Sequence, residues 1–165
     1  MPPPRDPRPS EAREAERERP NLASADLFAQ AIHYERRLAG RLSLYLGLRV
    51  LAYLVIDGVP REDVLSFGGD GGIRVFILGD APEGLWVAPM AGVGLVRADS
   101  AFGTQSGVGW WAGGLVGYTW VFSSGFTLSI GGGAQYTDLQ IHAPDGPVGA
   151  RGAHPTFRAA LGWAF

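Results

Sequence analysis

Apolar and polar residues alternate along most of this chain with a period of two. Between residues 42 and 54, every second position is Leu, Val or Ala, and the positions between them include Ser43, Tyr45 and Arg49. The stretch 126–137 repeats the alternation with a more polar second face. Successive side chains of a strand point to opposite faces, whereas an amphipathic helix repeats its apolar positions every three or four residues. The pattern therefore predicts long β-strands with one apolar face and one more polar face.

Seven strands are predicted by this alternation and by the turn residues that interrupt it. They are 24–38, 41–55, 71–79, 84–98, 107–122, 125–139 and 154–165. Most of them reach the roughly 9–11 residues that a tilted strand needs to cross the hydrocarbon layer of a membrane. A transmembrane helix would need about 20 consecutive apolar residues, and the sequence contains no such run.

The connections between these strands alternate between short and long. Short ones fall at 39–40, 81–84 and 123–125, and long polar ones fall at 57–71, 99–106 and 142–152. Transmembrane barrels have short turns at their periplasmic end and longer loops at their outer end. The sequence therefore predicts an all-β fold, namely an antiparallel up-and-down transmembrane β-barrel.

The last strand ends the chain on an aromatic residue. Counted back by twos, the positions of one face are Phe165, Trp163, Leu161, Ala159 and Phe157, and the residues between them are small or polar. This strand resembles the closing strand of bacterial outer-membrane barrels, in which a C-terminal Phe on the lipid face belongs to the assembly signal. The resemblance implies that the barrel-assembly machinery reads Phe157, Leu161, Trp163 and Phe165.

The number of predicted strands is odd, which conflicts with this architecture. Single-chain bacterial barrels have an even number of strands, and an open sheet edge in lipid costs several kcal/mol for each unpaired backbone group. About eight strands are therefore expected, with the missing one either upstream or hidden in a different fold of residues 21–37. Met1 is followed by Pro-Pro-Pro-Arg-Asp-Pro instead of a basic start and an apolar core. We expect the export signal, a signal peptide, to lie outside this sequence.

Composition divides the chain into a tail and one barrel domain. Residues 1–22 are rich in Pro, Arg and acidic residues, so they are predicted to form a disordered tail. Residues 23–165 form the predicted barrel domain. The net charge of −2 provides no basic surface for nucleic acid, and the absence of Cys removes disulfides and thiolate chemistry.

The more polar face of the strands carries several ionisable side chains. It includes His33, Glu35, Arg41, Arg49, Arg74 and Arg158, together with Tyr45, Tyr53, Thr127, Ser129 and Gln135. An eight-stranded barrel has an interior that side chains just fill, and an isolated charge buried there would be very costly. We therefore expect a plugged lumen that contains ion pairs. The expected counter-ion is Glu35, and its candidate partners are Arg49, Arg74 and Arg158.

Aromatic residues lie near the strand ends on the apolar face. They are Tyr34, Trp120, Phe122, Phe126, Tyr136, Trp163 and Phe165. In a membrane barrel such residues form girdles at the two membrane interfaces. The alternative is that they fill the core of a soluble barrel or sandwich.

The alternation, the closing strand and the loop asymmetry together give residues 24–165 a family resemblance. They resemble the small outer-membrane barrels of the OmpA-like and opacity-type superfamily, and segments 84–94 and 114–128 resemble hairpins of its uncharacterised members. The resemblance implies an integral protein of the Gram-negative outer membrane, surrounded by lipid and monomeric. It further implies a structural or surface-interaction role, and the residues themselves show no evident catalytic motif.

Two other functions stay open at this point. An outer-membrane lipid-modifying enzyme would need a Ser, a His and an acidic residue at one rim. The nearest candidates are Ser100, Ser106, Asp138, His142, Asp145 and His154. A soluble lipocalin-like barrel would instead turn its apolar face inward and bind a ligand there. No catalytic, cofactor-binding or metal-binding residue is assigned, since the spacing of His142, Asp145 and His154 matches no metal-ligand pattern.

Overall fold

The computed structural model describes the backbone of residues 19–28, 30–51, 54–56, 59–61, 64–100, 103–143 and 146–165. It describes the side chains of residues 19–28, 30–50, 67–97, 106–139 and 151–165. The predicted tail therefore lies outside the described residues up to residue 18. Within the described part of the chain, no helix is long and apolar enough to span a membrane.

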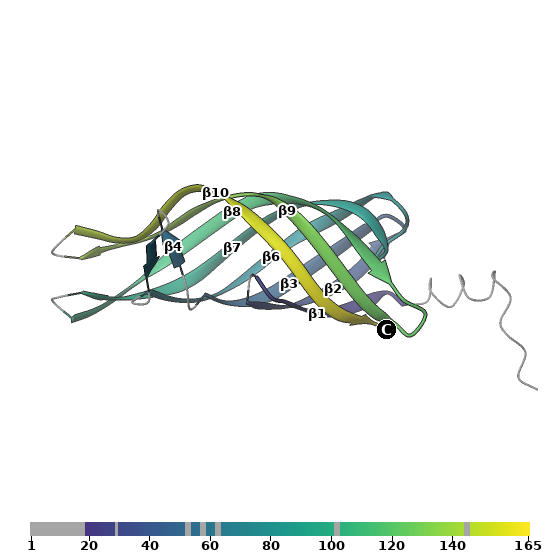
Figure 1. Ribbon diagram of the computed structural model, residues 1–165, viewed down its shortest axis with the longest axis horizontal. Coiled ribbons are helices and arrows are strands. Elements are labelled where there is room, and N and C mark those ends of the chain that lie inside the picture. The colour runs from purple at the N-terminus through teal and green to yellow at the C-terminus, as the bar shows by residue number, and fades with distance from the viewer. Residues whose placement is uncertain are drawn as a thin grey trace, which may run out of the picture.

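Eight of the described strands close into one antiparallel barrel (Figure 1). They are β1 (Asn21–Asp26), β2 (Ala31–Ala39), β3 (Leu42–Leu51), β6 (Val64–Leu78), β7 (Gly84–Ser100), β8 (Gly103–Val121), β9 (Phe126–Ala143) and β10 (Gly146–Ala164). A separate two-stranded sheet consists of β4 (Leu54–Ile56) and β5 (Val59–Arg61). Each barrel strand pairs with the next one along the chain, and β10 pairs with β1. The prediction of an all-β, antiparallel up-and-down barrel is confirmed.

The barrel closes where its first and last strands meet. Asn21 and Phe165 exchange backbone hydrogen bonds of 3.1 and 2.9 Å, and the pairing continues as far as Asp26 with Ala160. The start of β1 and the end of β10 therefore lie at the same rim, which also carries the short turns after β2, β6 and β8 (Figure 1). The described strands complete the ring by themselves.

The prediction of a single strand at 24–38 is wrong, because this stretch contains the second half of β1 and most of β2, joined by a tight turn. The Phe28 amide donates to Asp26 Oδ1 at 3.1 Å, and Gln30 has a left-handed backbone with a φ of 48°. Unlike the short turns after β2, β6 and β8, the segment between β1 and β2 contains no Gly or Pro, and its apolar residues resemble a continuing strand. The eighth strand is therefore β1. Of the two alternatives, a different fold of residues 21–37 is confirmed, and a missing strand upstream is wrong.

The predicted long loops are shorter than expected, because the strands beside them continue as paired extensions. β6 begins at Val64 rather than at residue 71. β7 and β8 stay paired as far as Ser100 and Gly103, and β9 and β10 as far as Ala143 and Gly146. These hairpins project well beyond the turn between β1 and β2 (Figure 1).

The Gly-rich stretch 68–72 belongs to the barrel wall and not to a loop. A Cβ atom at Gly72 would lie 2.2 Å from the Pro89 carbonyl oxygen and 2.8 Å from the Tyr45 hydroxyl. Real Cβ atoms do not approach other atoms so closely, so this position accepts only glycine without a local shift. Close packing against the next strand and the lumen, and not chain reversal, accounts for this glycine.

The two faces of the barrel wall have opposite character. Large apolar side chains cover the outer face, for example Leu46 and Val108, which are 60% and 73% exposed. Buried polar side chains point into the lumen: Ser24, Asp26, His33, Glu35, Ser43, Arg49, Asp70, Arg74, Thr119, Thr127, Ser129, Gln135, Thr137 and Arg158. This is the reverse of the apolar interior that a soluble lipocalin-like barrel would have.

Candidate functional site in the barrel lumen

The most enclosed ion pair of the lumen joins Glu35 on β2 to Arg74 on β6. Arg74 Nη1 lies 2.6 Å from Glu35 Oε2, and the Ser43 hydroxyl donates to Glu35 Oε1 at 2.5 Å. The Arg74 guanidinium also lies over the rings of Trp86 and Tyr45, 4.3 and 5.5 Å from their centres. The carboxylate and the aromatic faces together stabilise a cation that water does not reach.

Two further ion pairs lie nearer the long hairpins. Arg158 Nε is 3.8 Å from Asp26 Oδ2, and Arg49 Nη2 is 3.6 Å from Asp70 Oδ2. His33 Nε2 adds a second contact to this last carboxylate, 3.2 Å from Oδ1 of Asp70. Each of the three arginines buried in the described lumen thus faces a carboxylate of its own.

The predicted lumen residues lie together, and Glu35 pairs with one of its three candidate partners. Glu35 binds Arg74, whereas Arg49 and Arg158 lie against Asp70 and Asp26. The sequence analysis missed both aspartates, because one lies in the Gly-rich segment that resembles a loop and the other next to the unrecognised turn. Among the remaining residues expected to point inward, Arg41 is exposed, and Tyr53 lies outside the described side chains.

The lumen near the short turns is filled by rings and hydroxyl groups. Trp86 Nε1 donates to Thr119 Oγ1 at 2.9 Å, and that hydroxyl lies 2.9 Å from the Ser129 hydroxyl. Trp86 is fully buried, and Phe76 and Tyr45 are 1% exposed. These rings face glycines and other small residues, so the interior is packed at this level.

A second polar cluster lies in the half of the lumen toward the long hairpins. Gln135 Nε2 donates to Thr137 Oγ1 at 3.1 Å and lies 3.1 Å from His154 Nε2. Across the lumen, the guanidinium of Arg49 lies over the ring of Trp111, 5.1 Å from its centre. We call these five residues the upper cluster. The sequence analysis expected two of them, Arg49 and Gln135, on the inner face. The same alternation, continued along each strand, also puts Thr137, His154 and Trp111 on that face.

The upper cluster contains buried polar atoms without a hydrogen-bond partner in the described structure. They are Gln135 Oε1, Trp111 Nε1 and Arg49 Nε. The three side chains are 8%, 1% and 6% exposed. An unsatisfied buried donor or acceptor costs about 1–3 kcal/mol, so a small polar partner such as water or a ligand would stabilise this region.

The rim residues considered for a hydrolase do not converge where their side chains are described. His154 points into the lumen, whereas Asp138 points outward and lies 3.5 Å from Arg151. Ser106 is exposed, and the side chains of Ser100, His142 and Asp145 lie outside the described part. The described residues contain no cluster of three His, Cys, Asp or Glu side chains that could hold a metal ion.

Aromatic side chains form two belts on the outer face. The short-turn belt consists of Tyr34, Trp120, Phe122, Phe126, Trp163 and Phe165, all at least 38% exposed. The loop-side belt consists of Trp110 and Tyr136, whose ring centres are 5.5 Å apart. Ten residues separate Phe126 from Tyr136 along β9. At about 3.4 Å per residue and a strand tilt of about 40°, the belts lie about 25 Å apart along the barrel axis.

The closing strand contributes its predicted outward residues to this surface. Phe157, Leu161, Trp163 and Phe165 are 63%, 43%, 51% and 55% exposed. Leu161 lies between the belts, and the last two belong to the short-turn belt. The surface beyond the loop-side belt becomes charged at Asp138 and Arg151.

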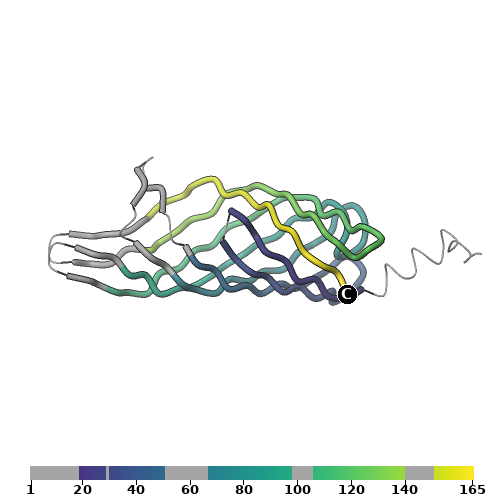
Figure 2. Tube along the Cα trace, turned by 60° about the horizontal axis from the view of Figure 1, so that its bottom comes forward, coloured from purple at the N-terminus to yellow at the C-terminus, as the bar shows by residue number. Residues whose placement is uncertain are grey.

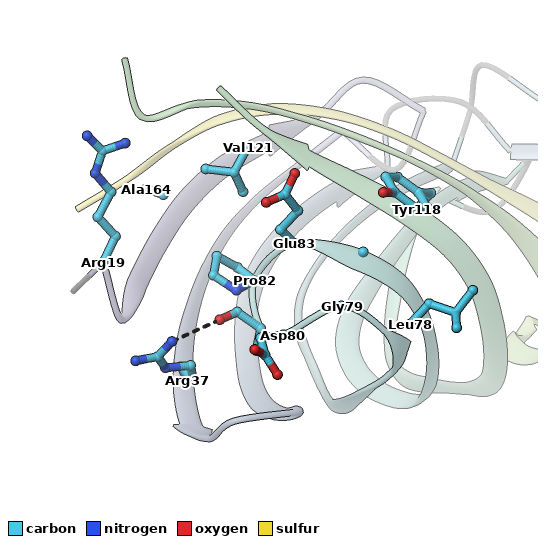
Figure 3. A pocket seen from close by; sticks show the side chains of 12 residues that line it. Arg19, Arg37, Leu78, Gly79, Asp80, Pro82, Glu83, Tyr118, Val121 and Ala164 are labelled. Carbon is cyan, nitrogen blue, oxygen red and sulfur yellow. Dashed lines mark hydrogen bonds between the residues drawn. The ribbon is translucent and has the colours of Figure 1, made fainter. Parts of the chain in front are cut away.

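The short-turn end of the barrel holds a cavity of about 420 Å³ (Figure 3). Arg37 Nη1 donates to the Ala81 carbonyl at 3.3 Å, which ties β2 to the turn between β6 and β7. Arg19 Nη2 donates to the Ser123 carbonyl at 3.0 Å on the other side. Both guanidinium groups thus hold turns together at this rim.

The lumen therefore combines balanced buried charges with buried polar atoms that have no hydrogen-bond partner in the described structure, both in the upper cluster and at Tyr45, Arg74 and Arg158. Such an interior can hold the strands in register and can accept a small polar group. No protein-family profile, curated protein or solved structure matches this chain.

Proposed function

We propose that this chain is an integral β-barrel of the Gram-negative outer membrane with a structural or surface-interaction role. One observation carries the proposal: the outer face is apolar between two aromatic belts about 25 Å apart, and it surrounds a lumen of buried ion pairs. On this proposal the chain belongs with the small OmpA-like and opacity-type barrels.

The amount of exposed apolar surface supports contact with lipid. Contiguous exposed apolar patches on soluble monomers rarely exceed a few hundred Å². Here exposed Leu, Ile, Val and aromatic side chains occur on the outer face of each of the strands β2, β3, β6, β7, β8, β9 and β10. Hydrocarbon is the solvent that matches such a surface.

The backbone supports the same proposal. A membrane-spanning sheet must satisfy its own backbone hydrogen bonds, and a closed barrel does so without free edges. The described strands form such a ring, and its seam joins β1 to β10. The rim with Asn21, Phe165 and the short turns would face the periplasm, and the long hairpins would face the cell exterior.

The packed lower lumen favours a structural role over conduction. The rings of Trp86 and Tyr45 and the Glu35–Arg74 pair occupy the cross-section of a barrel that is just wide enough for side chains. We propose no catalysis and no resident cofactor. The surface available to a partner would be the hairpins around residues 57–64, 99–106 and 142–152.

Assembly through the closing strand is part of the proposal. Phe157, Leu161, Trp163 and Phe165 are free on the outer face, where the barrel-assembly machinery could read them. The barrel has no further edge that needs a second copy, so a monomer in lipid is expected.

The proposal is tested by refolding the chain from urea into detergent micelles and comparing boiled with unboiled samples by electrophoresis. We expect a faster-migrating unboiled band and a β-rich circular dichroism spectrum. Folding of the same chain in plain buffer to a soluble monomer would contradict the proposal, because the outer apolar face would then be in contact with water and not with lipid.

A further inference from the structure

The cavity at the short-turn end is bounded by the turn between β6 and β7, residues 79–83. Ala81 in this turn is 2% exposed and belongs to the buried cluster that contains Trp86, so the turn closes the lumen. Figure 2 shows the end of β10 at this end of the barrel, beside the start of β1. The cavity of about 420 Å³ lies between the turn and the last residues of β8 and β10, Val121 and Ala164.

One side of the cavity reaches the outer face of the barrel. Leu78 and Tyr118 line the cavity, and both lie opposite Leu85 in the paired strands. Residues directly opposite each other in paired strands share a face, and Leu78 is 62% exposed. The centre of the Tyr118 ring lies 4.7 Å from that of Trp120, a member of the short-turn belt. The cavity is therefore continuous with this belt.

The other side of the cavity carries balanced charges. Two arginines and two carboxylates line it: Arg19, Arg37, Asp80 and Glu83. Figure 3 shows Arg19 and Glu83 on opposite sides of Val121, with the Glu83 carboxylate raised from the turn. The charged groups thus offer a cation and an anion on different parts of the same cavity wall.

Backbone carbonyls fix the position of Arg19. Its Nη2 donates to the Ser123 carbonyl at 3.0 Å, and its Nη1 donates to the Phe122 carbonyl at 3.5 Å. A guanidinium group has five N–H donors, so these two contacts leave donors for a ligand. Guanidinium groups bind phosphate with parallel, charge-assisted hydrogen bonds. Arg19 is therefore suited to a phosphate group at the edge of the cavity.

We propose that this cavity binds the head group of a zwitterionic aminophospholipid, with the phosphate on Arg19 and the ammonium group on Glu83. The inference rests on the proposed membrane position, which places the short-turn end in the periplasm-facing leaflet. The acyl chains would lie against Leu78 and Tyr118. The volume of about 420 Å³ is within the roughly 300–1,000 Å³ that is usual for small-molecule sites.

The balance of charge favours a zwitterion over an ion of one sign. A purely anionic head group would meet the carboxylates of Asp80 and Glu83, and a purely cationic one would meet the guanidinium groups of Arg19 and Arg37. A head group with both charges matches both, and such complementarity gives specificity. A primary ammonium group also donates hydrogen bonds to a carboxylate, whereas a trimethylated one has no N–H to donate. Ethanolamine is therefore preferred to choline.

The location of the cavity favours a lipid over a soluble zwitterion. Its apolar side adjoins the short-turn belt, and the aromatic belts of membrane barrels lie at the level of the lipid head groups. A lipid can place its head group in the cavity while its chains stay in the bilayer. Free phosphoethanolamine would use the charged side alone.

The test is native mass spectrometry of the full chain, refolded in detergent micelles and titrated with dilauroyl phospholipids that differ only in head group. We expect one saturable adduct with phosphatidylethanolamine, about fivefold tighter than with phosphatidylcholine or phosphatidylglycerol, as one additional hydrogen bond would give. Equal binding of the three lipids would overturn the zwitterion assignment. Glycerophosphoethanolamine should bind about tenfold more weakly because it buries no acyl chain. Equal binding of this soluble compound would overturn the assignment of a lipid.

Three variants locate the binding site. Arg19→Gln should weaken the binding of phosphatidylethanolamine about tenfold, since a charge-assisted contact with the phosphate is lost. Glu83→Gln should abolish the preference for phosphatidylethanolamine over phosphatidylcholine and leave phosphatidylcholine binding unchanged, which misfolding would not do. Arg36→Gln is the matched control, because Arg36 is exposed on β2 at the same end and does not line the cavity. Equal weakening by Arg19→Gln and Arg36→Gln would indicate general attraction to the rim and overturn the cavity site.

The membrane position is tested separately in the same samples. Electrophoresis of boiled and unboiled protein reports whether the barrel has folded in the micelles. A folded barrel without a preference for phosphatidylethanolamine would refute the cavity site and leave the proposed function intact. A chain that stays unfolded in micelles but folds in plain buffer would refute the membrane position, and this inference with it.

Discussion

The guanidinium of Arg74 lies 4.3 Å from the ring centre of Trp86, and neither side chain is reached by solvent. The arginine extends from β6, and the indole from the neighbouring strand β7. The carboxylate partner of Arg74 is Glu35 on β2, which lies two strands from β6 on the side away from β7. A single charged residue thus links three strands of the ring. The stability of this barrel depends on polar contacts where a soluble barrel would use an apolar core.

Removing the carboxylate of this pair should destabilise the barrel strongly. We expect Glu35→Ala to lower the free energy of unfolding by about 3–5 kcal/mol, because Arg74 would be left as an uncompensated buried charge. Urea titration of the refolded protein in lipid vesicles measures this loss. Asp138→Ala is the control, since Asp138 pairs with Arg151 on the outer surface and should contribute less than about 1 kcal/mol. Equal losses for both variants would show that burial of the pair has no energetic effect.

Removing both charges of the pair should cost less than removing one. Apolar residues of similar volume can replace a buried ion pair with little loss, since the desolvation cost of both ions disappears. We expect the double variant Glu35→Leu with Arg74→Met to be more stable than Glu35→Ala in the same titration. A double variant that is less stable than the single one would show that the contacts of Arg74 with the aromatic rings outweigh its charge.

Glycines of the wall should differ in their tolerance of a methyl group. A Cβ at Gly117 would lie 2.4 Å from the Trp86 ring and 2.5 Å from the Ile130 carbonyl oxygen. Gly117→Ala should therefore cost about 1–3 kcal/mol through overpacking. At Gly114 the nearest atom is 3.9 Å from such a Cβ, so Gly114→Ala should be nearly neutral. Unfolding free energies in vesicles distinguish the two, and a neutral Gly117→Ala would contradict the lumen packing described here.

The loss of stability caused by a charge on the outer face should depend on the position of that charge along the barrel axis. Ile130 lies between the aromatic belts, so Ile130→Arg should destabilise the barrel by about 2–4 kcal/mol in a bilayer. Phe126→Arg, on the same strand within the short-turn belt, should cost about 0–1 kcal/mol for the charge itself. The comparison is made in vesicles. A larger loss for Phe126→Arg would place the bilayer at a different height.

Much of the fold could be predicted because the two faces of the wall differ so strongly in polarity. Leu46 and Arg49 obey the alternation because one faces outward and the other faces the lumen. The turn between β1 and β2 escaped the same analysis, since it lacks Gly and Pro. One signal was present: polar inward residues fall on even numbers up to Asp26 and on odd numbers from His33 to Arg49. Only an intervening turn or bulge can change that parity.

The candidate site was predictable in its members but not in its pairings. Alternation assigns Glu35 and Arg74 to the lumen, yet it gives no information on which residues meet across the ring. That depends on how far each strand is shifted against its neighbours. Asp70 illustrates the limit: its glycine neighbours are typical of a loop, and their role in the wall becomes visible only when Tyr45 and Trp111 are placed opposite them.

The seam between β1 and β10 has a kinetic consequence. It is formed by five paired positions, whereas β9 and β10 share eighteen. Its two strands come from opposite ends of the domain, so their contact carries the largest loop-closure cost of any strand pair in the ring. The strands of the neighbouring hairpins can pair early in folding, and the pairing of β1 with β10 closes the barrel last. Short and late to form, it is also the place where thermal opening of the ring should begin, and the amide protons of β1 should exchange first among those of the barrel strands.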